Sequence, residues 1–155
     1  KAAMTIEPDE DYVIPLGKAR IAQQAGEEAI ENGESLLVVT YGMGVYWAAN
    51  ASAGFKEQVE ILDLRSLNPL DTEMIYERAQ KHGKVLVLTE ETIDNSFAES
   101  LAGRISRNCF EYLDAPVEIM GSINTPAIPL NSTLEQTMLP SADKVREVLK
   151  RLMEY

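Results

Sequence analysis

Two short apolar runs constrain the fold of this chain more than any other feature. Residues 35–41 read SLLVVTY and residues 84–89 read KVLVLT, and the apolar positions in both are consecutive rather than alternating. A strand of this kind must be buried on both faces, as the central strands of a parallel sheet are. The two runs therefore predict a sheet that is covered by helices on both sides.

The rest of the chain alternates between strand and helix patterns around these runs. Further strands are expected at 16–25, 59–64 and 116–120, and helices at 45–54, 72–81, 97–109 and after Ser141. The strand at 16–25 alternates only weakly, which favours a place at the edge. This order predicts an α/β fold, a three-layer α/β/α domain whose mostly parallel sheet has about five strands and one antiparallel edge strand.

Two stretches do not fit the alternation. Residues 27–33 are polar and predict a turn. Residues 121–139 contain Pro126 and Pro129 and predict an irregular segment. Because that segment is too long for a passive connection in a compact domain, we expect it to wrap the surface or to meet a neighbouring chain.

Composition and charge exclude some classes of function. The chain has 14 Lys and Arg against 25 Asp and Glu, a formal charge of −11, so it would repel a nucleic-acid backbone. A basic partner fits better, although the same charge also suits an ordinary solvated surface. No run of 18 apolar residues is present, so no membrane-spanning segment is expected. The acidic segment 1–15 reads as a linker from an upstream domain missing here, and residues 16–155 as one domain.

The chain has one cysteine and one histidine, which limits the kinds of active site that it could form. Cys109 lies on the apolar stripe of a predicted helix, so we interpret it as core packing, and it cannot form an internal disulfide. His82 stands at the end of another helix, where an imidazolium would interact favourably with the helix dipole. One histidine excludes a multi-histidine metal site. Glu90, Glu91 and Asp94 follow a strand, but nothing in sequence supplies a partner for acid-base chemistry.

A glycine turn after the first apolar run leaves a nucleotide site open as an alternative. Gly42 and Gly44 lie between a strand and a helix, and Asp63 ends the next strand, as in the dinucleotide-binding fingerprint. The third glycine of that fingerprint is replaced by Trp47, whose indole would crowd the contact between helix and sheet. The other interpretation is a glycine turn with a structural role alone.

Residues 59–71, VEILDLRSLNPLD, predict a strand-turn-helix unit, and its segment 63–71, DLRSLNPLD, points to a family. Together with LGKA at 16–19 and VTYGMG at 39–44, this segment resembles the C-terminal domain of transketolase-like enzymes. Within the segment, Asp71 is expected to cap a helix, Pro69 to stiffen the turn, and Arg65 to tie the turn to a neighbouring acid or subunit.

Later segments narrow the resemblance. YLDAP at 112–116, NTP at 124–126, LE at 134–135 and LPS at 139–141 are similar to the β subunit, or β half, of the thiamine-dependent 2-oxoacid dehydrogenase E1 component. The alternatives within the superfamily are transketolase and deoxyxylulose-phosphate synthase. Residues 95–98 read NSFA where the family usually has Gly-Gly-Phe-Gly. We therefore expect backbone angles there that residues other than glycine adopt readily.

The resemblance implies that this domain contributes to the assembly of the enzyme complex rather than to catalysis. Thiamine diphosphate and magnesium would be bound by other domains, so no catalytic, cofactor-binding or metal-binding residue is expected in this chain. The implied partners are an E1 α subunit or fused α half, a second copy of E1 β, and the small basic peripheral subunit-binding domain of the E2 acyltransferase. Asp114 and Glu118 match positions where the family places acids for that E2 domain, and Tyr155 is a further candidate. The implied location is the bacterial cytoplasm, or the mitochondrial matrix of a eukaryote.

Overall fold

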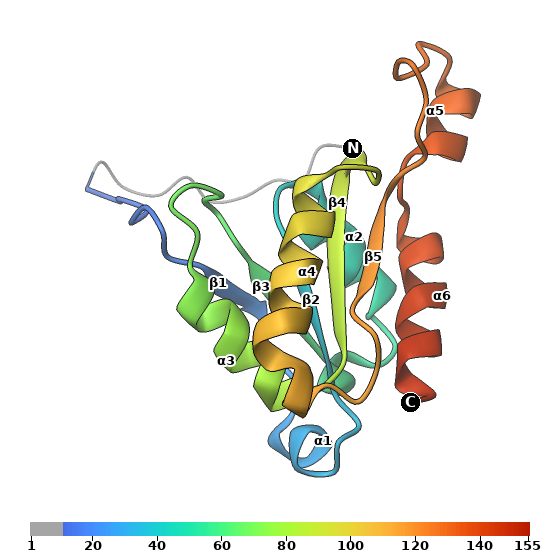
Figure 1. Cartoon of the computed structure of the whole chain (residues 1–155). Helices are drawn as coiled ribbons and strands as arrows, with labels where there is room; N and C mark the ends of the chain where they lie inside the picture. Colours follow the sequence, from blue (N-terminus) through green and yellow to red (C-terminus); the bar gives the residue numbers. More distant parts are fainter. Residues whose placement is uncertain (1–10) are drawn as a thin grey trace.

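A five-stranded sheet forms the middle of the molecule, and a computed structural model that describes residues 11–155 places it between two layers of helices (Figure 1). The strands are Arg20–Gln23 (β1), Leu36–Thr40 (β2), Val59–Asp63 (β3), Val85–Thr92 (β4) and Glu118–Ser122 (β5). Their order is β1-β3-β2-β4-β5. The β3–β2, β2–β4 and β4–β5 pairs are parallel, whereas β1 runs antiparallel to β3 at one edge. The predicted fold class is confirmed.

Four helices cover the two faces of the sheet. These are α2 (Met43–Ala51) and α6 (Ala142–Met153) on one face, and α3 (Thr72–His82) and α4 (Phe97–Cys109) on the other. In β2, Leu37 and Val39 belong to the core under α3 and α4, and Leu36 and Val38 belong to the core under α2 and α6. The first apolar run is therefore buried on both faces, as its pattern predicted.

Side-chain caps fix where three of these helices begin. Asp71 Oδ1 accepts a hydrogen bond from the Met74 amide at 3.3 Å, and Ser141 Oγ accepts one from the Lys144 amide at 3.3 Å. Ser96 Oγ accepts the amide of Glu99 at 3.0 Å. These caps satisfy amide groups that a first helical turn leaves free. The capping role predicted for Asp71 is confirmed, and Ser96 and Ser141 cap α4 and α6 in the same way.

The two irregular stretches were predicted incorrectly in part. Residues 27–33 contain a short helix, α1 (Glu27–Glu31), and residues 121–139 contain another, α5 (Ser132–Met138). Neither is long enough to show a helical period in sequence. Figure 1 shows that α5 and its connections project from the body of the domain rather than wrap its surface. Two 3₁₀ turns, η1 (Lys56–Gln58) and η2 (Phe110–Tyr112), complete the described elements.

The proposed domain boundary falls partly outside the described residues. Residues 1–10 of the expected linker are among those that the structure does not describe, and residues 11–19 contain no helix or strand. The chain joins the sheet at Arg20. Along the described part, no helix combines the length and the apolar character needed to cross a membrane.

Candidate functional site

The turn after β3 is the point where distant segments of the chain meet. Gly17 donates its amide to Ser66 Oγ at 2.9 Å, and Ala19 donates its amide to Asp71 Oδ2 at 3.0 Å. Asp71 therefore holds the incoming segment with one carboxylate oxygen and caps α3 with the other. The LGKA and DLRSLNPLD segments thus act as one structural unit.

Arg65 and Pro69 complete that unit. Arg65 Nη2 bonds to the hydroxyl of Tyr12 at 3.3 Å, so within this chain its partner is a tyrosine and not the acid that we expected. Pro69 follows a cis peptide bond and packs against Gly17, whose φ of +70° favours glycine. Ser66, Asp71, Arg65 and Pro69 therefore each have a structural partner within the chain.

The glycine turn after β2 also has a structural explanation. Gly42 has a φ of +57°, and a Cβ on Gly44 would collide with the Thr40 side chain. Asp63 accepts the Arg65 amide at 3.2 Å and pairs with Arg20 at 3.5 Å. The carboxylate that a nucleotide ribose would need is already engaged, which favours the structural interpretation of Gly42, Gly44 and Asp63.

The carboxyl end of β4 contains no paired carboxylates. Glu91 Oε1 accepts the Ala98 amide at 3.3 Å, so Glu91 supports the start of α4, while Glu90 is exposed. Burial raises the pKa of the nearby Tyr41, and the negative charges of Glu91 and Glu90 act in the same direction. The Tyr41 hydroxyl bonds to Thr89 Oγ1 at 2.8 Å. This group of residues suits local structure better than acid-base catalysis.

The segment that replaces the family's glycines keeps one special backbone angle. Asn95 has a φ of +58°, so the expectation of ordinary angles at 95–98 is wrong at this position. Asparagine tolerates left-handed angles better than most residues. Phe97 packs edge-on against Tyr41 with ring centroids 6.0 Å apart. The turn is therefore preserved without its glycines.

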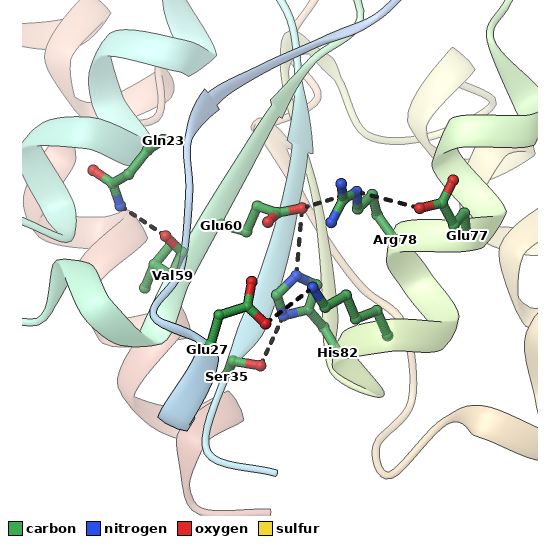
Figure 2. A network of polar contacts seen from close by, with 9 residues as sticks. Gln23, Glu27, Ser35, Val59, Glu60, Glu77, Arg78 and His82 are labelled. Carbon is green, nitrogen blue, oxygen red and sulfur yellow. Dashed lines mark hydrogen bonds and ion pairs between the residues drawn. The ribbon is translucent and has the colours of Figure 1, made fainter. Parts of the chain in front are cut away.

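A buried polar cluster joins β2, β3 and α3 at the amino end of the parallel strands (Figure 2). Ser35 Oγ lies 2.7 Å from His82 Nδ1, and His82 Nε2 lies 3.4 Å from Glu60 Oε1. Arg78 Nε lies 3.5 Å from the same carboxylate oxygen. The exposed fractions are 1% for Ser35, 2% for His82 and 0% for Glu60.

This cluster contains the residue types of a hydrolase triad but cannot act as one. A catalytic serine must reach its substrate, and the Ser35 hydroxyl is buried under the edge of the sheet. His82 is thus a core residue with polar partners, which refines its interpretation as a residue at a helix end. Glu60 was missed because its strand was interpreted through its apolar positions alone.

Cys109 is buried in the core between α4 and α3. Its Sγ lies 3.9 Å from the carbonyl oxygen of Tyr76. Burial raises the pKa of the thiol, and a hydrogen bond with Gln80 opposes that shift. Its interpretation as a packing residue is confirmed.

The three candidate docking residues lie toward the same end of the domain. Asp114 precedes β5, Glu118 begins it, and Tyr155 follows the last turn of α6, where Figure 1 marks the C-terminus. Arg151 of α6 pairs with Glu118 at 3.0 Å. Asp114 is exposed, and its amide bonds to Gly83 O at 2.9 Å, which fixes its loop. The structure therefore connects Glu118 to the C-terminal helix and presents Asp114 on a fixed loop.

An apolar pocket beside Asp114 was not foreseen. Its volume is about 440 Å³, and apolar side chains of η2 and the following loop line most of it. They are Phe110, Leu113, Ala115, Pro116 and Val117. Phe110 is 77% exposed. The only signal in the sequence was the aromatic pair of the segment CFEYLDAP, which reads equally well as the end of a helix.

The described residues do not fit a thiamine diphosphate and magnesium site. They contain no group of three or more His, Cys, Asp or Glu side chains that could hold a metal ion. Gly42, whose φ is positive, follows β2 and precedes the first residue of α2, so it serves the turn between these two elements. We derive no catalytic step from this chain.

Comparisons with known proteins agree with these features. Residues 26–145 match the family described as "Transketolase, C-terminal domain". The 2-oxoisovalerate dehydrogenase subunit beta of Bacillus subtilis is 35% identical over 151 residues, which cover 96% of this chain and 44% of that protein. The pyruvate dehydrogenase E1 component subunit beta of Rhizobium meliloti is 31% identical over 144 residues, 91% of this chain and 29% of that protein.

A solved structure supports the fold alone. It is described as "Split gene transketolase, inactive beta4 tetramer" and matches with a TM-score of 0.71 at 17% sequence identity. The match covers 94% of this chain and 45% of that one. The chain thus spans less than half the length of these proteins.

Proposed function

Because the chain belongs to the family of transketolase C-terminal domains, we propose that it is the C-terminal assembly domain of a thiamine-dependent 2-oxoacid dehydrogenase E1 β component. The observation that carries the proposal is the match to E1 β subunits over nearly the whole chain. The identities of 31–35% to these subunits, against 17% to the transketolase structure, favour E1 β over the transketolase alternative.

The proposed division of labour leaves the chemistry to the rest of the enzyme. Thiamine diphosphate and magnesium would supply decarboxylation of the 2-oxoacid in domains outside this chain, and the acyl group would pass to lipoyl-E2. The isolated chain should show no turnover of a 2-oxoacid with thiamine diphosphate and magnesium, and measurable turnover would overturn this division of labour.

The proposed partners are those of an E1 β chain. They are an E1 α subunit or fused α half, a second E1 β, and the peripheral subunit-binding domain of E2, in the cytoplasm of a bacterial cell. Net charge supports the last of these, because a chain of charge −11 attracts a basic module. The alternative of a stand-alone nucleotide-binding module predicts heat of binding with NAD or ATP, and we expect none because Asp63 is engaged.

We propose that the E2 domain docks at Asp114 and Glu118, next to the apolar pocket lined by Phe110. A basic side chain of E2 would meet the exposed Asp114 directly, and would compete with Arg151 for Glu118. An apolar side chain of the same partner would fill the pocket. Tyr155, which is exposed beyond α6, would lie at the border of this surface. Charge and an adjoining apolar anchor together are the usual features of a specific interface.

The test is a calorimetric titration of the E2 domain at low salt. Asp114→Lys and Glu118→Lys should each weaken binding by more than about tenfold, because each replaces attraction by repulsion. The matched control is Glu77→Lys, the same charge change at an exposed position of α3. Equal effects of all three substitutions would show a general charge effect and would contradict the proposed docking surface.

A further inference from the structure

Asn32 and Gly33 form the only Asn-Gly pair in the sequence. The pair follows α1, which Figure 1 shows beyond the amino ends of the parallel strands. An asparagine followed by glycine cyclises readily, because glycine has no side chain to hinder attack by its backbone nitrogen. Both residues are exposed, and within residues 11–155 only chain neighbours lie closer than 4 Å to where a Gly33 Cβ would stand. Water and the reacting groups therefore have free access to the pair.

The fold holds this pair in a tight turn. Gly33 donates its amide to Ile30 O at 3.1 Å, and its carbonyl oxygen accepts a hydrogen bond from Lys84 Nζ at 2.9 Å. Asn32 keeps helical angles, with φ of −82° and ψ of −4°, and Gly33 has a φ of +70°. Cyclisation requires the Gly33 nitrogen to lose its proton and to turn toward the Asn32 side chain. The turn must therefore open before the pair can react.

Lys84 connects the turn to the sheet. It is 4% exposed and lies just before β4, while its hydrogen-bond partner Gly33 lies 51 positions earlier in the chain. An ammonium group that is buried so deeply needs a polar partner. Because α1 has only five residues, it is not stable by itself. The ion pair between Glu27 and Lys81, at 3.6 Å, also ties α1 to α3, but it is partly exposed and contributes less. Lys84 is therefore the buried side chain that holds the turn closed.

We propose that Asn32 is a site of spontaneous deamidation and that the contact with Lys84 sets its rate. When the turn opens, the Gly33 nitrogen attacks the side-chain carbonyl carbon of Asn32. A bond forms between these two atoms, the bond from that carbon to the side-chain amide nitrogen breaks, and ammonia leaves with the proton of the Gly33 amide. Water then adds to either carbonyl of the cyclic imide and gives aspartate or isoaspartate at position 32. This site lies outside the proposed docking surface and does not depend on the proposed function.

The products should weaken the turn that protected the asparagine. Both products add a negative charge at the carboxyl end of α1, where an anion is unfavourable, beside the exposed Glu28, Glu31 and Glu34. Isoaspartate also lengthens the main chain by a methylene group. That changes the spacing between the amide of Glu34 and the Ala29 oxygen, which it now meets at 2.8 Å. The modified chain should therefore hold α1 less firmly.

Peptide mapping by mass spectrometry tests the site and its dependence on the fold. The chain is incubated in warm, mildly alkaline buffer, with and without urea. Asn32 should convert more than about tenfold faster in urea, because the turn no longer restrains Gly33. Asn95 and Asn124 are exposed and precede larger residues, so they should convert more slowly than Asn32 in urea. Equal rates for Asn32 with and without urea, or faster conversion at either reference asparagine, would overturn the proposal.

Replacing the buried lysine tests the role of its contact. Lys84→Met removes the ammonium group and keeps an unbranched side chain, so the folded variant should convert Asn32 more than about threefold faster than the wild type. In urea the two chains should convert equally, because residues 33 and 84 are far apart in the sequence. Lys150→Met, at an exposed position of α6, is the matched control and should change neither rate. An unchanged rate in the folded Lys84→Met variant would remove the role of Lys84.

Hydrogen exchange of the wild-type chain gives a measurement that needs no variant. Exchange at the Gly33 amide reports the fraction of time for which the turn is open. The conversion rate of the folded chain should equal the rate in urea multiplied by that fraction. A folded rate well above this product would show that Asn32 reacts in the closed turn, and would overturn the proposed dependence on opening.

Discussion

Glu60 is the residue whose environment departs most from what its position in the sequence indicates. It is fully buried in β3, and its carboxylate faces Arg78 and His82 of α3 (Figure 2). A buried charge is tolerated only when partners compensate for its lost hydration. The three side chains therefore depend on one another for the stability of the contact between α3 and the sheet.

Replacing Glu60 alone should be costly for this reason. Glu60→Leu should lower the free energy of unfolding by about 3–5 kcal/mol, because it leaves Arg78 buried against an apolar side chain. Urea denaturation measures this loss, with the exposed Glu77→Leu as a control expected to change stability by about 0.5 kcal/mol or less. Equal effects of the two substitutions would show that the cluster contributes no more to the free energy of unfolding than an exposed residue does.

Cys109 gives a second prediction at the scale of a residue. Because burial raises the pKa of its thiol and shields it, the native chain should not react with a thiol reagent at pH 8, and urea should release the reaction. The exposed thiol of a Ser100→Cys variant should react at once under native conditions. Native labelling of Cys109 at a comparable rate would contradict its place in the core.

At the scale of elements, the helix caps differ in the number of segments that they connect. Asp71 caps α3 and also bonds to the Ala19 amide, whereas Ser141 caps α6 with one hydrogen bond. Asp71→Ala should therefore cost about 2 kcal/mol or more in unfolding free energy, and Ser141→Ala about 1 kcal/mol. Thermal and urea denaturation of both variants provide the comparison. A larger loss for Ser141→Ala would refute the view of Asp71 as a junction.

The elements also show which parts of the fold the sequence could predict. The strands at 35–41 and 84–89 were predicted because continuous apolar runs have one favourable environment, the middle of a covered sheet. The helices α1 and α5 were missed because five and seven residues are too few for a period. The cap at Asp71 and the glycine turn at Gly42 were local signals and could be predicted from a few residues.

The candidate site was less predictable than the fold. Asp114 and Glu118 were found through a resemblance, but the pairing of Glu118 with Arg151 joins residues 33 positions apart. The pocket beside Asp114 and the cluster around Glu60 likewise bring together side chains from separate elements. Short sequence patterns cannot predict such contacts, because tertiary packing brings together residues that are far apart in the sequence.

At the scale of the whole molecule, the chain presents two different kinds of surface. Acids and an apolar pocket meet near the start of β5, and the segment after the end of the same strand projects from the domain and has no charged side chain between residues 123 and 134. A domain with separate exposed surfaces of different character is suited to contacts with more than one partner. The proposed function places the docking of E2 at the first of these surfaces.

The most direct test of the proposed assembly role measures decarboxylation and acyl transfer separately, in the full E1 enzyme to which the proposal assigns this chain. Asp114→Lys with Glu118→Lys should leave turnover with an artificial electron acceptor unchanged, because neither residue takes part in decarboxylation. Acyl transfer to E2 at limiting E2 concentration should fall by more than about tenfold, because docking is lost. An equal fall in both activities would place these residues in the chemistry, and unchanged acyl transfer would remove the docking role.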